Sequence, residues 1–189
     1  IKFHSEQYSL EEVIRSAIDN ARAAVCAKDA FVAFDVGPTG KLLEPMGELS
    51  FEETIDAFAL PIRIATAHGG IDFILIETMS DLYELKAAVT AAQSCTDLPI
   101  ICTVTVDDTG RMLTGADMKT AAAVMEDLGV FAMGLNCSLG PDKLLPYVSK
   151  LLEEASIPVI VQANAGLPHK DGEHVIYDIT PSQFATYET

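Results

Sequence analysis

The 189-residue chain carries 12 Lys and Arg residues against 28 Asp and Glu residues, a formal net charge of −16, and 49% of its residues are hydrophobic. This length and composition indicate one globular domain. The acidity excludes nucleic-acid binding and attachment to an anionic membrane, because both depend on clustered Lys and Arg. No apolar run approaches the roughly 18 residues of a membrane-spanning helix.

Helical and strand patterns alternate along the chain. Apolar residues recur at helical spacing in five segments, and two of these open with a Ser-x-x-Glu capping box, at Ser9 and Ser50. The short, almost unbroken apolar runs between them are typical of strands buried on both faces of a parallel sheet. The predicted helices cover residues 10–28, 50–68, 81–94, 117–128 and 141–155, and the predicted strands 31–34, 71–76, 99–106, 130–135 and 157–161.

This alternation predicts an α/β fold with a parallel sheet covered by helices. Two architectures remain open: a doubly wound sheet, or a segment of a (β/α)8 barrel, since a whole barrel needs about 250 residues. In both, substrates bind at the carboxyl ends of the strands. The residues that follow each predicted strand are therefore the candidates for function.

Acids, amides and one thiol follow the predicted strands. Together they predict a polar, slightly negative rim, which suits a small substrate with an amino group or a metal ion. Simpler roles stay open: Glu77 could cap the next helix, Asn164 could belong to a turn, and Asp107 and Asp108 fit a solvated turn. The strand-end residues are Asp35, Glu77, Asp107, Asp108, Asn136, Cys137, Gln162 and Asn164.

The segment from Gly37 to Lys41 is similar to a phosphate-binding loop but does not match it. That loop needs a glycine where Asp35 stands and a serine or threonine where Leu42 stands. The sequence therefore argues against a nucleotide site here.

The cysteines are widely spaced and contain no CxxC pair, and the chain does not open with a signal peptide, so reduced thiols in the cytoplasm are expected. Three of them, Cys26, Cys95 and Cys102, are predicted to be small buried apolar residues. Cys137 lies at a strand end before a Gly-Pro that opens a helix, which favours a reactive thiolate or a metal ligand. The histidines lack metal-ligand spacing and are expected at the surface: His4, His68, His169 and His174.

Several motifs, which follow one another along the chain, resemble those of the homocysteine S-methyltransferase family. Within it they are most similar to the homocysteine-binding module of cobalamin-dependent methionine synthases. The motifs are Gly37-Pro38-Thr39-Gly40, Glu77-Thr78-Met79-Ser80, Leu113-Thr114-Gly115, Asn136-Cys137-Ser138-Leu139-Gly140-Pro141 and Asn164-Ala165-Gly166.

The resemblance implies a (β/α)8 barrel of which residues 1–189 hold about five units, strands three to seven, without the first two units and the last. In the family, three cysteines hold a zinc ion that binds the homocysteine sulfur. The resemblance assigns Cys137 to the first zinc cysteine, Asn164 to the open zinc position, and Glu77 and Asn136 to substrate binding. The family's other two zinc cysteines form a Gly-Gly-Cys-Cys-Gly run, which this sequence does not contain, so the zinc site is expected to be incomplete.

The resemblance further implies that the parent protein transfers a methyl group to the homocysteine thiolate. The expected donor is a methylated cobalamin carried by other domains, with a folate domain as a further partner, and the segment alone is expected to be inactive. Two alternatives stay open: a donor such as a methylated sulfonium or amine, or a non-catalytic module. Open sheet edges at residues 31–34 and 157–161 predict homo-oligomers.

Overall fold

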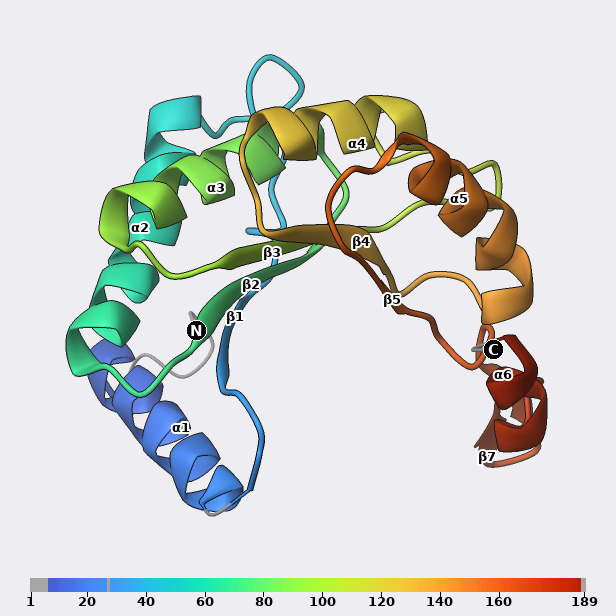
Figure 1. The fold of residues 1–189 in the computed structure, drawn as a ribbon, viewed down its shortest axis with the longest axis horizontal. Helices are drawn as coiled ribbons and strands as arrows, with labels where there is room; N and C mark the ends of the chain where they lie inside the picture. The colour runs from blue at the N-terminus through green and yellow to red at the C-terminus, as the bar shows by residue number, and fades with distance from the viewer. Residues whose placement is uncertain (1–6, 27, 188–189) are drawn as a thin grey trace. The chain divides into compact units, whose positions relative to one another are not determined.

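The computed structural model describes residues 7–26 and 28–187. Figure 1 follows the elements along the chain by colour. No helix in this described part is long and apolar enough to cross a membrane. In chain order the elements are α1 (Leu10–Val25), β1 (Ala33–Val36), α2 (Phe51–His68), β2 (Phe73–Met79), α3 (Leu82–Cys95), β3 (Ile100–Val104), α4 (Met118–Asp127), β4 (Ala132–Asn136), α5 (Pro141–Glu154), β5 (Val159–Gln162), β6 (His169–Asp171), β7 (His174–Ile176) and α6 (Pro181–Tyr187).

Five strands form one sheet in the order β1-β2-β3-β4-β5. The β1 and β2 strands are parallel, with Ala33 opposite Phe73, and so are β4 and β5, with Met133 opposite Val159. The predicted five-strand α/β fold is confirmed. The antiparallel β6–β7 pair and the short α6 were not predicted, because their exposed residues carry no apolar period.

The chain divides into two compact units. The first takes the described residues up to Ile76 together with Tyr83–Ile101. The second takes Glu77–Leu82 and the described residues from Cys102 onward. Each unit is described by itself below.

In the first unit, α1 packs against α2, and α2 packs against β1. The buried face of α1 contains Ile14 and Ile18, and that of α2 contains Phe58 and Ile62. Both helices begin with the predicted capping boxes, in which a serine side chain and a glutamate side chain satisfy each other's backbone N–H groups. The helix starts that local chemistry predicts are therefore confirmed.

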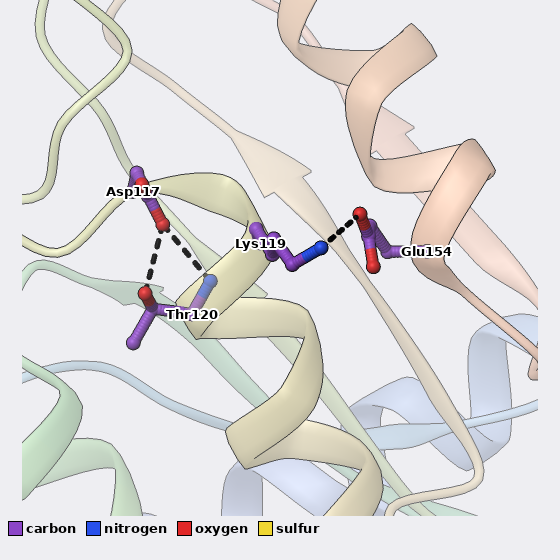
Figure 2. A network of polar contacts seen from close by, with 4 residues as sticks. All are labelled: Asp117, Lys119, Thr120 and Glu154. Carbon is purple, nitrogen blue, oxygen red and sulfur yellow. Dashed lines mark hydrogen bonds and ion pairs between the residues drawn. The ribbon is translucent and has the colours of Figure 1, made fainter.

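In the second unit, α5 packs on β4 and β5 and also contacts α4 and α6. Figure 2 shows how α4 is held: the Asp117 carboxylate caps the helix, accepting from the Thr120 N–H at 3.0 Å and hydroxyl at 2.8 Å. Within the first turn of the helix, the Lys119 ammonium reaches Glu154 of α5 at 3.0 Å. The helix predicted to begin at about residue 117 begins at Met118, with Asp117 as its cap, and an exposed ion pair joins α4 to α5.

Glycine permits a close approach between β4 and β5. A Cβ atom on Gly134 would lie 1.7 Å from the carbonyl oxygen of Ile160. Any side chain at this position would push the two strands apart. Because Asn136 is only two residues further along β4, Gly134 also helps to place the end of that strand.

Candidate functional site

The four residues predicted for the site all belong to the second unit. Glu77 lies in β2 and is half-buried. Asn136 is the last residue of β4 and is only 3% exposed, and Cys137 follows it, half-buried. Asn164 follows β5 and is also half-buried. Glu77 and Asn136 were predicted to follow their strands, but β2 and β4 extend further and include them near their carboxyl ends. Cys137 and Asn164 follow β4 and β5, as predicted.

The buried amide of Asn136 is the centre of a hydrogen-bond network. Its oxygen accepts from the backbone N–H of Thr78 at 3.0 Å and from the hydroxyl of Thr103 at 2.9 Å. Its nitrogen donates to the hydroxyl of Thr78 at 2.7 Å and to the sulfur of Cys137 at 3.5 Å. A side-chain amide can donate two hydrogen bonds from its nitrogen and accept two at its oxygen. Asn136 makes all four of these bonds.

The backbone around this network has unusual torsions. Thr78, Cys137 and Ser138 have φ angles of 61°, 58° and 54°, in the left-handed region that residues with side chains rarely adopt. Such conformations cost about 1–3 kcal/mol each and persist only where the surroundings enforce them. Here the Ser138 hydroxyl donates to the Val106 carbonyl at 2.6 Å, and the Cys137 N–H donates to the Gln162 carbonyl at 3.1 Å. The conformation of the Cys137 segment is therefore set by neighbouring strand ends.

Asn164 is tied to the same region through its backbone. Its N–H donates to the carbonyl oxygen of Leu139 at 3.1 Å, which joins the loop after β5 to the loop after β4. The structure thus brings the loops of Asn164 and Cys137 together. The ligand role assigned to the Asn164 side chain stays a prediction.

The sequence analysis did not single out Thr78 and Thr103, two residues of this network. Thr103 is fully buried in β3, within the run Ile-Ile-Cys-Thr-Val. A hydroxyl inside an otherwise apolar buried strand needs a polar partner, and that signal was present in the sequence. Thr78 directly follows Glu77, but nothing local indicates its left-handed backbone.

Two acidic residues near other strand ends, Asp107 and Asp35, have carboxyl groups whose pKa is shifted from the ordinary value. Asp107 is exposed and forms the predicted turn: hydrogen bonds from the Thr109 hydroxyl, then from the N–H groups of Arg111 and Thr109, lower the pKa of its carboxyl. Asp35 lies in the first unit, and partial burial raises the pKa of its carboxyl. The hydrogen bonds of Asp107 are those of a turn residue.

The prediction for the cysteines is wrong at Cys26, which is exposed, because it caps the C-terminal end of α1 and α1 buries only the face of Ile14 and Ile18. Cys95 is half-buried. Cys102 is buried as predicted, and burial raises the pKa of its thiol, so it behaves as a packing residue.

The described histidines lie at or near the surface. His169 and His174 are exposed, and His68 is half-buried with its ring nitrogen 2.8 Å from Asp19. His4 lies outside the described residues. The predicted surface positions of His169 and His174 are confirmed.

The described residues do not form a metal centre by themselves. Across residues 7–26 and 28–187, no three His, Cys, Asp or Glu side chains gather closely enough to hold a metal ion. A zinc site uses three or four protein ligands. The thiol of Cys137 has the donor chemistry of one such ligand but not of a complete set.

A cavity of about 540 Å³ lies beside the loops that follow β4 and β5, a size suited to small molecules. Leu139 and Gly140 line it from one loop, and Gly166 from the other. Its outer wall carries charged groups of both signs, among them Lys143 and Asp178. Space for a small polar ligand therefore adjoins the loops of Cys137 and Asn164.

These features define a class: a helix-covered parallel sheet of βα units with polar groups and a thiol at the carboxyl ends of its strands. Residues 2–189 match the family model for homocysteine S-methyltransferase. The chain belongs to the homocysteine S-methyltransferase family.

Known relatives agree with this assignment. The methionine synthase of Mycobacterium leprae (strain TN) is 36% identical over 160 residues, which cover 82% of this chain and 13% of the relative. The chain thus spans a small part of that protein. The apo form of the homocysteine methyltransferase MmuM from Escherichia coli superposes with a TM-score of 0.71 at 19% identity, covering 85% of this chain and 63% of MmuM. The metallated form of MmuM superposes with a TM-score of 0.69 at 18% identity, covering 87% and 62%. The observed sheet therefore corresponds to a part of the TIM-barrel-like fold of homocysteine methyltransferases.

Proposed function

We propose that this chain forms the homocysteine-binding part of a homocysteine S-methyltransferase of the methionine synthase type. The observation that carries the proposal is the hydrogen-bonded cluster of Thr78, Asn136 and Cys137, with Glu77 next in sequence to Thr78. In this proposal the 189 residues supply the third to seventh βα units of the family barrel. The five consecutive parallel strands support that placement.

Glu77 and Cys137 have complementary roles in the proposal. The carboxylate of Glu77 would bind the amino group of homocysteine, since a charge-assisted hydrogen bond is a strong contact for an ammonium group. Cys137 would supply one ligand of a zinc centre, with Asn164 near its open position and the remaining ligands outside the described residues. When bound, zinc favours the deprotonated form of a coordinated thiol and so supplies a nucleophile at neutral pH.

The proposed methyl donor is a methylated cobalamin carried by other domains of the parent protein, with a folate domain as a further partner. The similarity to a methionine synthase supports this donor. Other donors of the family, such as a methylated sulfonium, are distinguished by assaying each with homocysteine. The chain itself contributes the acceptor side of the reaction.

The proposed roles can be tested in the full-length protein with Glu77→Gln and Cys137→Ala. Glu77→Gln should retain zinc and weaken homocysteine binding by about 1.5–3 kcal/mol, or about 10–150-fold, because a charged hydrogen bond is lost. Cys137→Ala should lose zinc and activity together. Calorimetry and metal analysis measure both effects, and Glu153→Gln on the exposed face of α5 is the control. Unchanged homocysteine affinity in Glu77→Gln would contradict the assigned role.

The 189-residue chain alone should bind zinc poorly. One thiolate without two partner thiolates makes a weak site, and no cluster of three potential ligands exists among the residues that the structure describes. After dialysis, elemental analysis should find well under one zinc per chain. A stoichiometric zinc that resists chelators would show that this chain or a second copy supplies the missing ligands.

A further inference from the structure

The side-chain amide of Asn136 is buried and bonds to neighbouring protein groups, so any effect on a substrate passes through those groups. It is 3% exposed, and both of its polar atoms are committed to bonds inside the second unit. A backbone N–H can only donate, so the Thr78 N–H requires the oxygen of Asn136 to face it and the nitrogen to face Cys137. The orientation of the amide is therefore determined by its partners, and no donor or acceptor is left over for a substrate.

Besides Thr103 of β3, the partners of this amide come from two strand ends that the proposed function uses. The oxygen of Asn136 holds the backbone of Thr78, the residue after Glu77, and the nitrogen contacts the Cys137 sulfur. The hydroxyl of Thr78 accepts from the same nitrogen and lies 4.0 Å from that sulfur. Thr78 and Cys137 both have left-handed backbones, which need such external support.

We infer that Asn136 is a positioning residue, whose buried amide ties the Glu77-Thr78 end of β2 to Cys137 after β4 and so keeps carboxylate and thiol in one geometry. This inference rests on the proposed roles of Glu77 and Cys137. The resemblance assigned Asn136 to direct substrate binding; in this inference Asn136 instead holds the residues that bind the substrate. A displacement of about 1 Å at a reacting group can cost about 100-fold in rate, so the loss of this tie should affect binding and turnover beyond its effect on folding.

The test uses the full-length protein with Asn136→Asp, which keeps the shape and the oxygen that accepts from Thr78 and Thr103. It replaces the amide nitrogen by an oxygen, so the bond donated to the Cys137 sulfur is lost and the Thr78 hydroxyl can be held only as a donor. The control is Thr54→Val, which removes a buried hydroxyl of the first unit that is bonded to the carbonyl of Ser50, the cap of α2. Three quantities are measured: the melting temperature, the homocysteine dissociation constant, and the rate of iodoacetamide alkylation at Cys137 relative to the exposed Cys26, resolved by peptide mass spectrometry.

We expect folded Asn136→Asp to bind homocysteine at least about 10-fold more weakly and to change the Cys137-to-Cys26 alkylation ratio at least about 5-fold. Thr54→Val should lower only the melting temperature. If folded Asn136→Asp keeps both the native affinity and the native alkylation ratio, Asn136 is merely structural and the inference is wrong.

A second pair of variants decides the question if Asn136→Asp does not fold. Thr78→Val removes the hydroxyl that the amide holds and keeps the branched shape, so it should reproduce the altered alkylation ratio. Thr78→Ser restores the hydroxyl and should return the ratio to within about 2-fold of the native value. Equal ratios in Val and Ser variants would overturn the inference. If the native protein binds no homocysteine, the proposed function is wrong. The alkylation ratio still tests whether Asn136 links Thr78 to Cys137.

Discussion

At the residue scale, Asp72 shows how one carboxylate joins distant parts of the first unit. It forms an ion pair with the Arg22 guanidinium of α1 at 2.6 Å and accepts from the Val32 N–H before β1 at 2.6 Å. Arg22 also donates to the Gly70 carbonyl. These bonds, first the one from Arg22 and then the one from Val32, lower the pKa of the Asp72 carboxyl below its ordinary value of 3.8.

Asp72 should therefore make stability depend on pH in the acid range. A carboxyl with a lowered pKa stabilises the fold fully above its unfolded value, and the stabilisation is lost as the pH falls through the folded value. Asp72→Asn should lower the melting temperature at about pH 7, and its difference from the native protein should shrink below about pH 4. Thermal melts across this range measure the effect. The control is Asp127→Asn, an exposed position at the end of α4. A difference that does not vary with pH would contradict the prediction.

At the element scale, the start of α2 depends on two side chains. The Ser50 hydroxyl accepts from the Glu53 N–H at 3.2 Å, and the Glu53 carboxylate accepts from the Ser50 N–H at 3.0 Å. These bonds satisfy N–H groups that the first turn of a helix leaves without partners. Since α2 packs on both α1 and β1, its first turn affects the whole first unit.

Ser50→Ala should lower the free energy of unfolding by about 1 kcal/mol, because the cap is lost and alanine cannot replace it. Ser149→Ala is the matched control. The Ser149 hydroxyl donates to the Leu145 carbonyl inside α5 and caps nothing, so alanine there should change stability by less than about 0.5 kcal/mol. Urea denaturation measures both, and equal losses in the two variants would show that the cap contributes nothing specific.

At the scale of the whole molecule, the edges of the sheet favour association between copies of the chain, and the net charge opposes it. The strand order places β1 and β5 at the two ends of the sheet. Apolar strand edges are templates for pairing with another chain, and Phe31, just before β1, is 77% exposed. The net charge of −16 repels other copies, but salt screens this repulsion beyond about 8–10 Å.

The 189-residue chain should therefore associate more strongly as salt increases. Repulsion acts at long range and is screened, whereas strand pairing and apolar contact act at short range and are not. Sedimentation velocity at about 0.02 M and about 0.5 M salt should show a monomer giving way to a dimer or larger species. A clean monomer at both salt concentrations would show that the sheet edges are protected.

Local chemistry was enough to predict much of this protein from its sequence. The capping boxes at Ser9 and Ser50 involve residues only three positions apart, so a short stretch of sequence is enough to recognise them. The unbroken apolar strands predicted a parallel α/β sheet, because only strands covered on both faces can be apolar throughout. The predicted strand positions then indicated which residues lie near the carboxyl ends of the strands, including Glu77 and Cys137.

Other features were decided only by the tertiary structure. Asn136 meets Thr78 and Thr103 across 58 and 33 positions of sequence, so no local pattern records that its amide is fully used. The left-handed backbones of Thr78 and Cys137 run against their own preferences and exist because neighbouring strand ends enforce them. The sequence by itself determined the elements, the α/β class and the candidate residues, since these depend on short-range periodicity. The folded chain alone decided how those residues are held, because hydrogen bonds between distant strands form only when the sheet has assembled.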